Sequence, residues 1–234
     1  MPNNVQLRGG VNRRQFLQIA AVGAVSGIVT PSLPAWGWSP RLDTRPHLSP
    51  DGALEELLEG NRRFAANRLT SIEHNLAILR EHTADRQEPF AAVLACADSR
   101  VPVELIFDQS IGHIFVTRVA GNIVTPEMIA SLEYAVAVLG VRTVLVLGHS
   151  SCGAVKAAMK TDTVPGQIST LYQHIRPAVQ LSGGDVAKAI EANARLQADL
   201  LRTSSTVIRD ATAKSTLSVA AAVYDLATGK VALT

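Results

Sequence analysis

Short runs rich in apolar and β-branched residues recur along the chain and are separated by longer stretches with helical periodicity. The runs cover residues 90–95, 113–119, 143–147 and 218–225. The run at 143–147 is apolar throughout, which is typical of a strand buried on both faces of a parallel sheet. The run at 218–225 is followed by Thr228-Gly229 and by residues 230–233, a pattern that predicts a terminal hairpin.

Between these runs, apolar residues recur at the three- and four-residue spacing of amphipathic helices. The predicted helices cover residues 49–66, 71–83, 125–139, 166–181 and 184–203, with a short helical turn at 102–107 and a further helix beginning near Ser151. Ser49 and Pro50 supply a cap and a first-turn proline, and Gly140 and Gly183-Gly184 end or interrupt helices. Strands that alternate with helices predict an α/β domain with a central, mostly parallel β-sheet flanked by helices.

The first 37 residues differ in character from the rest of the chain. Arg13-Arg14 precede an uncharged apolar run of about 11 residues, 19–29, and Ala35 and Gly37 offer small residues after it. This layout is typical of a secretory signal peptide, and the run is shorter than the roughly 20 residues that a membrane-spanning helix needs. The arginine pair followed by Phe16-Leu17 resembles a twin-arginine signal, with an ordinary signal for unfolded export as the alternative.

We therefore expect a signal peptide at 1–37, a linker at 38–48 and one catalytic domain at 49–234. The expected location is extracytoplasmic, in the periplasm, after export by the twin-arginine route and without a permanent membrane anchor. Three of the 22 Lys and Arg residues and none of the 20 acidic residues lie in the first 37 positions, so the remainder carries a net charge of −1. Together with the 4% aromatic content, this balance argues against a nucleic-acid partner.

Two short polar motifs each follow a predicted strand. They are Cys96-Ala97-Asp98-Ser99-Arg100 and Gly148-His149-Ser150-Ser151-Cys152-Gly153. Sites in parallel sheets form at the carboxyl ends of strands, so the two motifs are expected to meet. Two thiolates and one imidazole form a three-ligand set for Zn²⁺ that leaves a fourth position for water or substrate. The alternative for the only two cysteines of an exported protein is one disulfide, which the His-x-x-Cys spacing disfavours.

The residues beside these ligands indicate what the metal would do. Zn²⁺ lowers the pKa of a bound water and so generates hydroxide. Asp98 lies two residues from Cys96, and the planar guanidinium of Arg100 suits a carboxylate. Held by Arg100, Asp98 would accept the proton of zinc hydroxide; released, it would take the fourth position and close the site. The simpler alternative for this pair is a surface ion pair of little energetic value.

Two further motifs complete a resemblance to a known family. They are Arg118-Val119-Ala120-Gly121-Asn122 and Ser131-Leu132-Glu133-Tyr134-Ala135. Together with the two metal-site motifs they resemble the β-class carbonic anhydrases, and the resemblance covers roughly residues 50–230. It implies reversible hydration of CO2 to bicarbonate and a proton. It also implies a homodimer or higher homo-oligomer, in which N-terminal helices pack on the partner.

By matching positions, the resemblance implies that Cys96, His149 and Cys152 bind one Zn²⁺ per chain and that Asp98 and Arg100 form the catalytic dyad. Gln109 lies near a glutamine that holds substrate in some members, although the local spacing differs. The alternatives are hydrolysis of carbon disulfide or carbonyl sulfide at the same site, and a secreted zinc-binding protein without catalysis. A nucleotide-binding protein is disfavoured because no glycine-rich phosphate loop follows a predicted strand.

Overall fold

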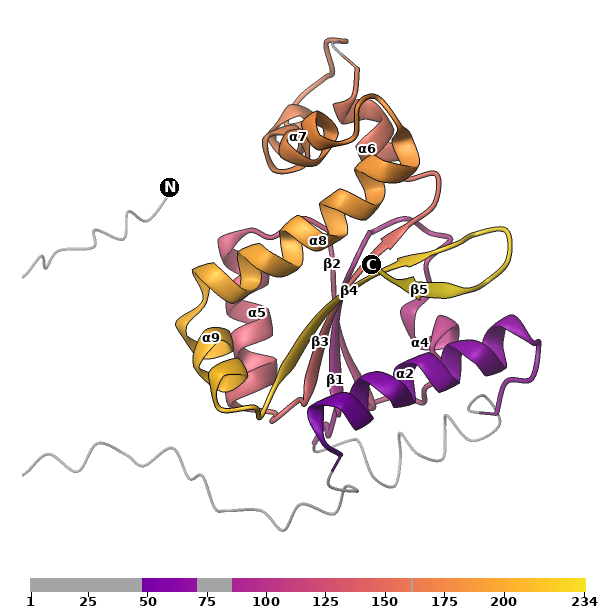
Figure 1. Ribbon diagram of the computed structural model, residues 1–234, viewed down its shortest axis with the longest axis vertical. Helices are drawn as coiled ribbons and strands as arrows, with labels where there is room; N and C mark the ends of the chain where they lie inside the picture. Colours follow the sequence, from indigo (N-terminus) through magenta and orange to yellow (C-terminus); the bar gives the residue numbers. More distant parts are fainter. Residues whose placement is uncertain (1–47, 71–85, 161) are drawn as a thin grey trace, which may run out of the picture. The chain divides into compact units, whose positions relative to one another are not determined.

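The computed structural model describes residues 48–70, 86–160 and 162–234, and its centre is one five-stranded sheet (Figure 1). The strand order is β2-β1-β3-β4-β5. The strands are β1 (Ala91–Ala95), β2 (Ile114–Arg118), β3 (Thr143–His149), β4 (Ser218–Tyr224) and β5 (Val231–Leu233). The first four are parallel, and β5 returns antiparallel to β4 as the predicted hairpin. The predicted α/β class with a mostly parallel sheet is confirmed.

Helices cover both faces of this sheet. They are α2 (Pro50–Ala65), α4 (Val103–Ile106), α5 (Pro126–Ala137), α6 (Gly153–Ala158), α7 (Tyr172–Leu181), α8 (Val186–Ser204) and α9 (Thr206–Ala213), with a 3-10 helix, η2 (Ile168–Leu171). Helices α5, α8 and α9 lie on one face, and α2 and α4 lie on the other. Among the described residues, no helix is both long and apolar enough to cross a membrane.

Alternating side chains of β1 explain why its sequence is apolar at every position. Ala92 and Leu94 pack with Leu132 of α5 and Leu201 of α8, whereas the remaining β1 residues pack with Leu57 of α2 and with α4. Each face of the strand therefore meets its own helical layer, and all five residues of β1 are buried. Burial on two sides replaces the alternation that a half-exposed strand would show.

Four local details differ from the sequence-based expectation. Residues 148 and 149 were expected to follow the strand, but they extend β3, because Gly148 and His149 pair with Val223 and Tyr224 of β4. The helix expected near Ser151 begins at Gly153 instead. The stretch 166–181 divides into η2 and α7, and α9 was not expected at all. The helix predicted at 71–83, the signal peptide and nearly all of the linker lie outside the described residues.

The pairing of β1 with β3 is the feature that places the candidate site. The two strands are neighbours in parallel register, with Ala95 opposite Leu147. Their carboxyl ends therefore lie at the same edge of the sheet. The motif that follows β1 and the motif that ends β3 are brought together there, as expected for an α/β sheet.

Candidate metal centre

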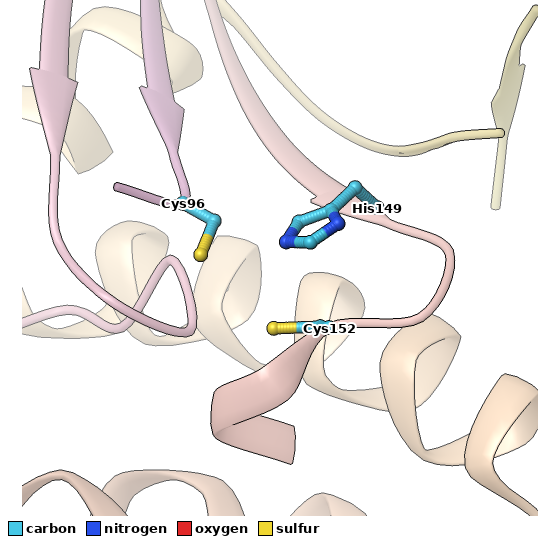
Figure 2. A group of neighbouring side chains, drawn as sticks. All are labelled: Cys96, His149 and Cys152. Carbon is cyan, nitrogen blue, oxygen red and sulfur yellow. The ribbon is translucent and has the colours of Figure 1, made fainter. Parts of the chain in front are cut away.

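Cys96, His149 and Cys152 converge from three different elements (Figure 2). Cys96 directly follows β1, His149 is the last residue of β3, and Cys152 directly precedes α6. All three are buried, and their potential ligand atoms lie within 4.8 Å of one another. Both cysteines are free thiols, so the alternative of a structural disulfide does not hold here.

The imidazole of His149 is arranged as a metal ligand. Its Nδ1 lies 3.0 Å from the carbonyl oxygen of Ser150, which can only accept, so Nδ1 carries the proton. Its Nε2 is buried and has no hydrogen-bond partner within the described part of the chain. A buried lone pair without a partner is costly, and a metal ion would satisfy it. The residues present thus fit Zn²⁺, which favours sulfur and nitrogen ligands.

The two thiols differ in how readily they ionise. The hydrogen bond from Cys152 lowers the pKa of Cys96 to about 4 against the opposing effect of burial, with the backbone N–H of Gly121 assisting. The same hydrogen bond, together with burial, raises the pKa of Cys152 far above its usual range. Cys96 is therefore the thiol that ionises more readily. A divalent cation would favour ionisation of the second thiol as well.

Asp98 and Arg100 form the predicted pair with two-pronged geometry. Arg100 Nε donates to Asp98 Oδ1 at 2.9 Å, Nη2 donates to Oδ2 at 2.8 Å, and the Arg100 backbone N–H donates to Oδ1 at 2.9 Å. These bonds hold the pKa of Asp98 well below its usual range. Asp98 Oδ2 also lies 3.8 Å from His149 Nε2, so the carboxylate reaches the edge of the ligand cluster while Arg100 holds it.

Arg118 fixes the loop that carries both the first ligand and this carboxylate. Its Nε donates to the carbonyl oxygen of Cys96 at 3.0 Å, and its Nη2 donates to the carbonyl oxygen of Asp98 at 2.6 Å. Arg118 ends β2, beside β1 in the sheet. Its motif was recognised in the sequence, but this contact was not foreseen, because nothing local to residue 118 indicates which carbonyl groups it meets.

The side chain of Gln109 contacts helix α2. Its Nε2 donates to Glu56 Oε1 of α2 at 3.3 Å, and its backbone N–H donates to the carbonyl of Glu104. Among the hydrogen bonds of the described residues, none joins Gln109 to Cys96, His149 or Cys152. A substrate-binding role for Gln109 stays a prediction.

Comparison with known proteins identifies the arrangement. The family model "Carbonic anhydrase" matches residues 91–231. Carbonic anhydrase 2 of Mycobacterium tuberculosis is 34% identical over 200 residues, which cover 80% of this chain and 94% of that protein. The carbonic anhydrase of Mycolicibacterium smegmatis is 35% identical over 198 residues, covering 80% and 95% of the two chains.

Solved structures agree with the sequence relatives. A tetrameric β-carbonic anhydrase from Sordaria macrospora superposes with a TM-score of 0.62 at 26% identity, covering 77% of this chain and 95% of that one. The Coccomyxa β-carbonic anhydrase in complex with acetazolamide gives a TM-score of 0.62 at 29% identity, covering 77% and 85%. Fold, Cys-His-Cys cluster and relatives coincide, and the chain belongs to the β-class of the carbonic anhydrase family.

Proposed function

We propose that the protein is a zinc enzyme that interconverts CO2 and bicarbonate, with one Zn²⁺ per chain bound by Cys96, His149 and Cys152. The observation that supports this most strongly is the buried, unpartnered Nε2 of His149, which shares its site with two free thiols. Zinc in that position would act as a Lewis acid that lowers the pKa of a bound water.

The neighbouring residues divide the remaining tasks. Asp98 is ionised and serves as a hydrogen-bond acceptor at the edge of the ligand cluster. Oδ2 accepts one hydrogen bond from Arg100 and keeps a second lone pair, so Asp98 can still orient a proton donor. Arg100 holds the carboxylate in that orientation and away from the ligand position. We propose these two residues as the catalytic dyad.

Apolar side chains restrict solvent around the thiols. Ile123, Val155 and Ile175 pack in one buried cluster with Cys96 and Cys152. Moving apolar CO2 from water into this cluster costs little free energy, whereas moving an ion there costs the free energy of its hydration. The environment therefore favours entry of the neutral substrate.

The test is stopped-flow CO2 hydration on purified protein, with zinc measured in the same samples. His149→Gln is expected to lose zinc and activity together, because the ligand set falls from three residues to two. His113→Gln is the matched control, since His113 lies outside the cluster, and it is expected to keep both. Zinc-loaded protein without hydration activity would support the non-catalytic alternative instead.

We propose in addition that the mature protein is an exported homo-oligomer with residues 49–234 as its catalytic domain. The layout of residues 1–37 supports export by the twin-arginine route to the periplasm. The tetrameric state given for the Sordaria macrospora relatives supports assembly. Sedimentation of the mature protein tests this assembly, and a monomeric active enzyme would contradict it.

A further inference from the structure

A backbone amide close to the metal ligands donates to one of the two sulfurs. The N–H of Gly121 lies 3.2 Å from Cys96 Sγ, and this contact is buried. Gly121 lies in the loop after β2, outside any helix or strand. Its φ is +80° and that of Asn122 is +44°, so the loop has an irregular backbone. The Asn122 N–H closes the turn by donating to the Val119 carbonyl at 2.9 Å, but Gly121 itself belongs to no strand ladder.

The carbonyl group of the same glycine is held from α8. Asn193 Nδ2 donates to the carbonyl oxygen of Gly121 at 2.9 Å, although the two residues are far apart in the sequence. Packing limits Gly121 as well, because a Cβ at this position would lie 2.7 Å from Cδ1 of Ile175. Gly121 is thus fixed by a side-chain amide on one side and by a buried isoleucine on the other.

Gln197, one helical turn beyond Asn193, supports the same loop. Its Oε1 accepts from the Val124 backbone N–H at 2.7 Å, and its Nε2 donates to the His174 carbonyl at 3.0 Å and to Asn193 Oδ1 at 3.3 Å. Asn193 is 1% exposed and Gln197 is 3% exposed. Asn193 thus joins α8 to the residue that donates to Cys96, and Gln197 supports Asn193 and the same loop at Val124.

We propose that Asn193, supported by Gln197, is a positioning residue of the metal centre, which keeps the Gly121 N–H on Cys96 Sγ and so sets how much charge that sulfur gives to the metal. The inference rests on the proposed zinc site. A hydrogen bond to a ligand sulfur withdraws electron density from it, and partners of this outer kind tune a metal's properties.

The expected effect of losing this support depends on how much electron density Cys96 Sγ gives to the metal. When the N–H is no longer held against the sulfur, the thiolate becomes a stronger donor and its lone pairs rise in energy. The sulfur-to-metal charge-transfer band of a cobalt(II)-substituted protein should then move to longer wavelength. The metal becomes a weaker Lewis acid, so the midpoint of the activity–pH profile should move to higher pH.

Asn193→Leu is the main variant, because leucine has a similar volume and makes no hydrogen bond. Asn193→Asp is the second variant, since it keeps shape and replaces the donating amide nitrogen by oxygen. Asn61→Leu is the matched control. Asn61 is 4% exposed and makes three hydrogen bonds, to the Ile106 and Gly229 carbonyl groups and from the Val231 N–H, none of them at the metal cluster.

Wild-type protein and the three variants are loaded with cobalt(II), and band position, metal affinity by chelator competition, the midpoint of the activity–pH profile, and Tm are compared. We expect the band shift in both Asn193 variants and, because Cys96 is no longer held in its orientation, an affinity loss of about 10-fold. Asn61→Leu should lower Tm without moving the band. An unchanged band and pH midpoint in whichever Asn193 variant folds would overturn the inference. Wild-type protein that binds cobalt without any thiolate band would instead overturn the proposed metal site.

Discussion

The hydrogen bonds between Asp98 and Arg100 determine where the Asp98 carboxylate lies beside the metal ligands. Two side-chain bonds and one backbone bond join them, while Asp98 Oδ2 stays within 3.8 Å of a ligand nitrogen. Arg100 is largely exposed, so a Coulomb attraction alone would be screened by solvent. The two-pronged geometry is therefore what fixes the carboxylate, and the pair should behave as one functional unit.

We predict that the losses caused by Arg100→Ala and Asp98→Ala do not multiply. Without Arg100, Asp98 is free to move into the ligand position, so Arg100→Ala should keep its metal and be nearly inactive. Asp98→Ala lacks that closing carboxylate but also lacks the acceptor, so it should hydrate CO2 slowly. Measured as kcat/KM in all four proteins of the cycle, the double change should cost less than the product of the single losses. Strictly multiplicative losses would contradict the switch described here.

A second residue-scale prediction concerns two neighbouring arginines of α2. Arg63 Nε lies 2.6 Å from Oδ2 of Asp108, whose side chain is fully buried, whereas Arg62 pairs with exposed Glu55 and Glu59. Arg63→Ala should lower the free energy of unfolding by about 1.5–3 kcal/mol, the usual contribution of a hydrogen bond to a charged group. Arg62→Ala should leave denaturant unfolding nearly unchanged. Equal effects of the two substitutions would argue against a structural role for the buried carboxylate.

At the scale of elements, helix α8 depends on its first turn for a defined start. Asp185 caps it, and its Oδ1 accepts from the backbone N–H groups of Ala187 and Lys188. These bonds, of which the one from Lys188 has the larger effect, lower the pKa of Asp185. Since α8 carries both Asn193 and Gln197, its capped end matters beyond the helix itself.

The lowered pKa predicts how stability depends on pH at this cap. A depressed carboxyl pKa favours the folded state above the unfolded-state value of about 3.9, and the contribution is lost as pH falls through the folded-state value. The Tm difference between wild type and Asp185→Ala should therefore be full at pH 6 and shrink in acid. Asp185→Asn, which caps without a charge, should differ from Asp185→Ala by an amount that pH does not change. A difference between wild type and Asp185→Ala that grows in acid would refute this sign.

The elements of this chain differ in how well sequence indicates them. Strand β1 was predictable because helices cover both of its faces and leave it no polar position. The end of β3 was not, since glycine after an apolar run is typical of a turn, whereas Gly148 and His149 pair with Val223 and Tyr224 of β4. Helix α9 was missed because it is short, and Ser205 both follows α8 and caps α9 by accepting from the Ile208 N–H.

The sequence indicates the metal site only in part, because some of its contacts join residues that are far apart in the chain. Its ligands were predictable because each lies in a short motif at a strand end. The support from Asn193 and Gln197 was not, because it depends on how a helix more than 70 residues further along packs against the loop. The strand order was likewise beyond the sequence pattern, which indicates that strands exist but not which of them pair.

At the scale of the whole molecule, the location of the enzyme can be tested through its first residues. Arg13→Lys combined with Arg14→Lys should retain full-length precursor in the cytoplasm if the twin-arginine signal is used. Fractionation with immunodetection measures this, and the catalytic domain is unaltered by the change. Normal export of the double variant would favour an ordinary secretory signal.

The chain order of the strands has a consequence for biosynthesis. The metal ligands lie at 96, 149 and 152, but β3 is flanked on one side by β4, which comes from the last residues of the chain. The loop after β3 is also fastened there, because Ser150 donates through its backbone N–H to Tyr224 and accepts through Oγ from the Leu226 N–H. All three ligands therefore leave the ribosome well before the strand that secures them. A chain whose translation stops before residue 218 has all three metal ligands but lacks β4, the strand that pairs with β3.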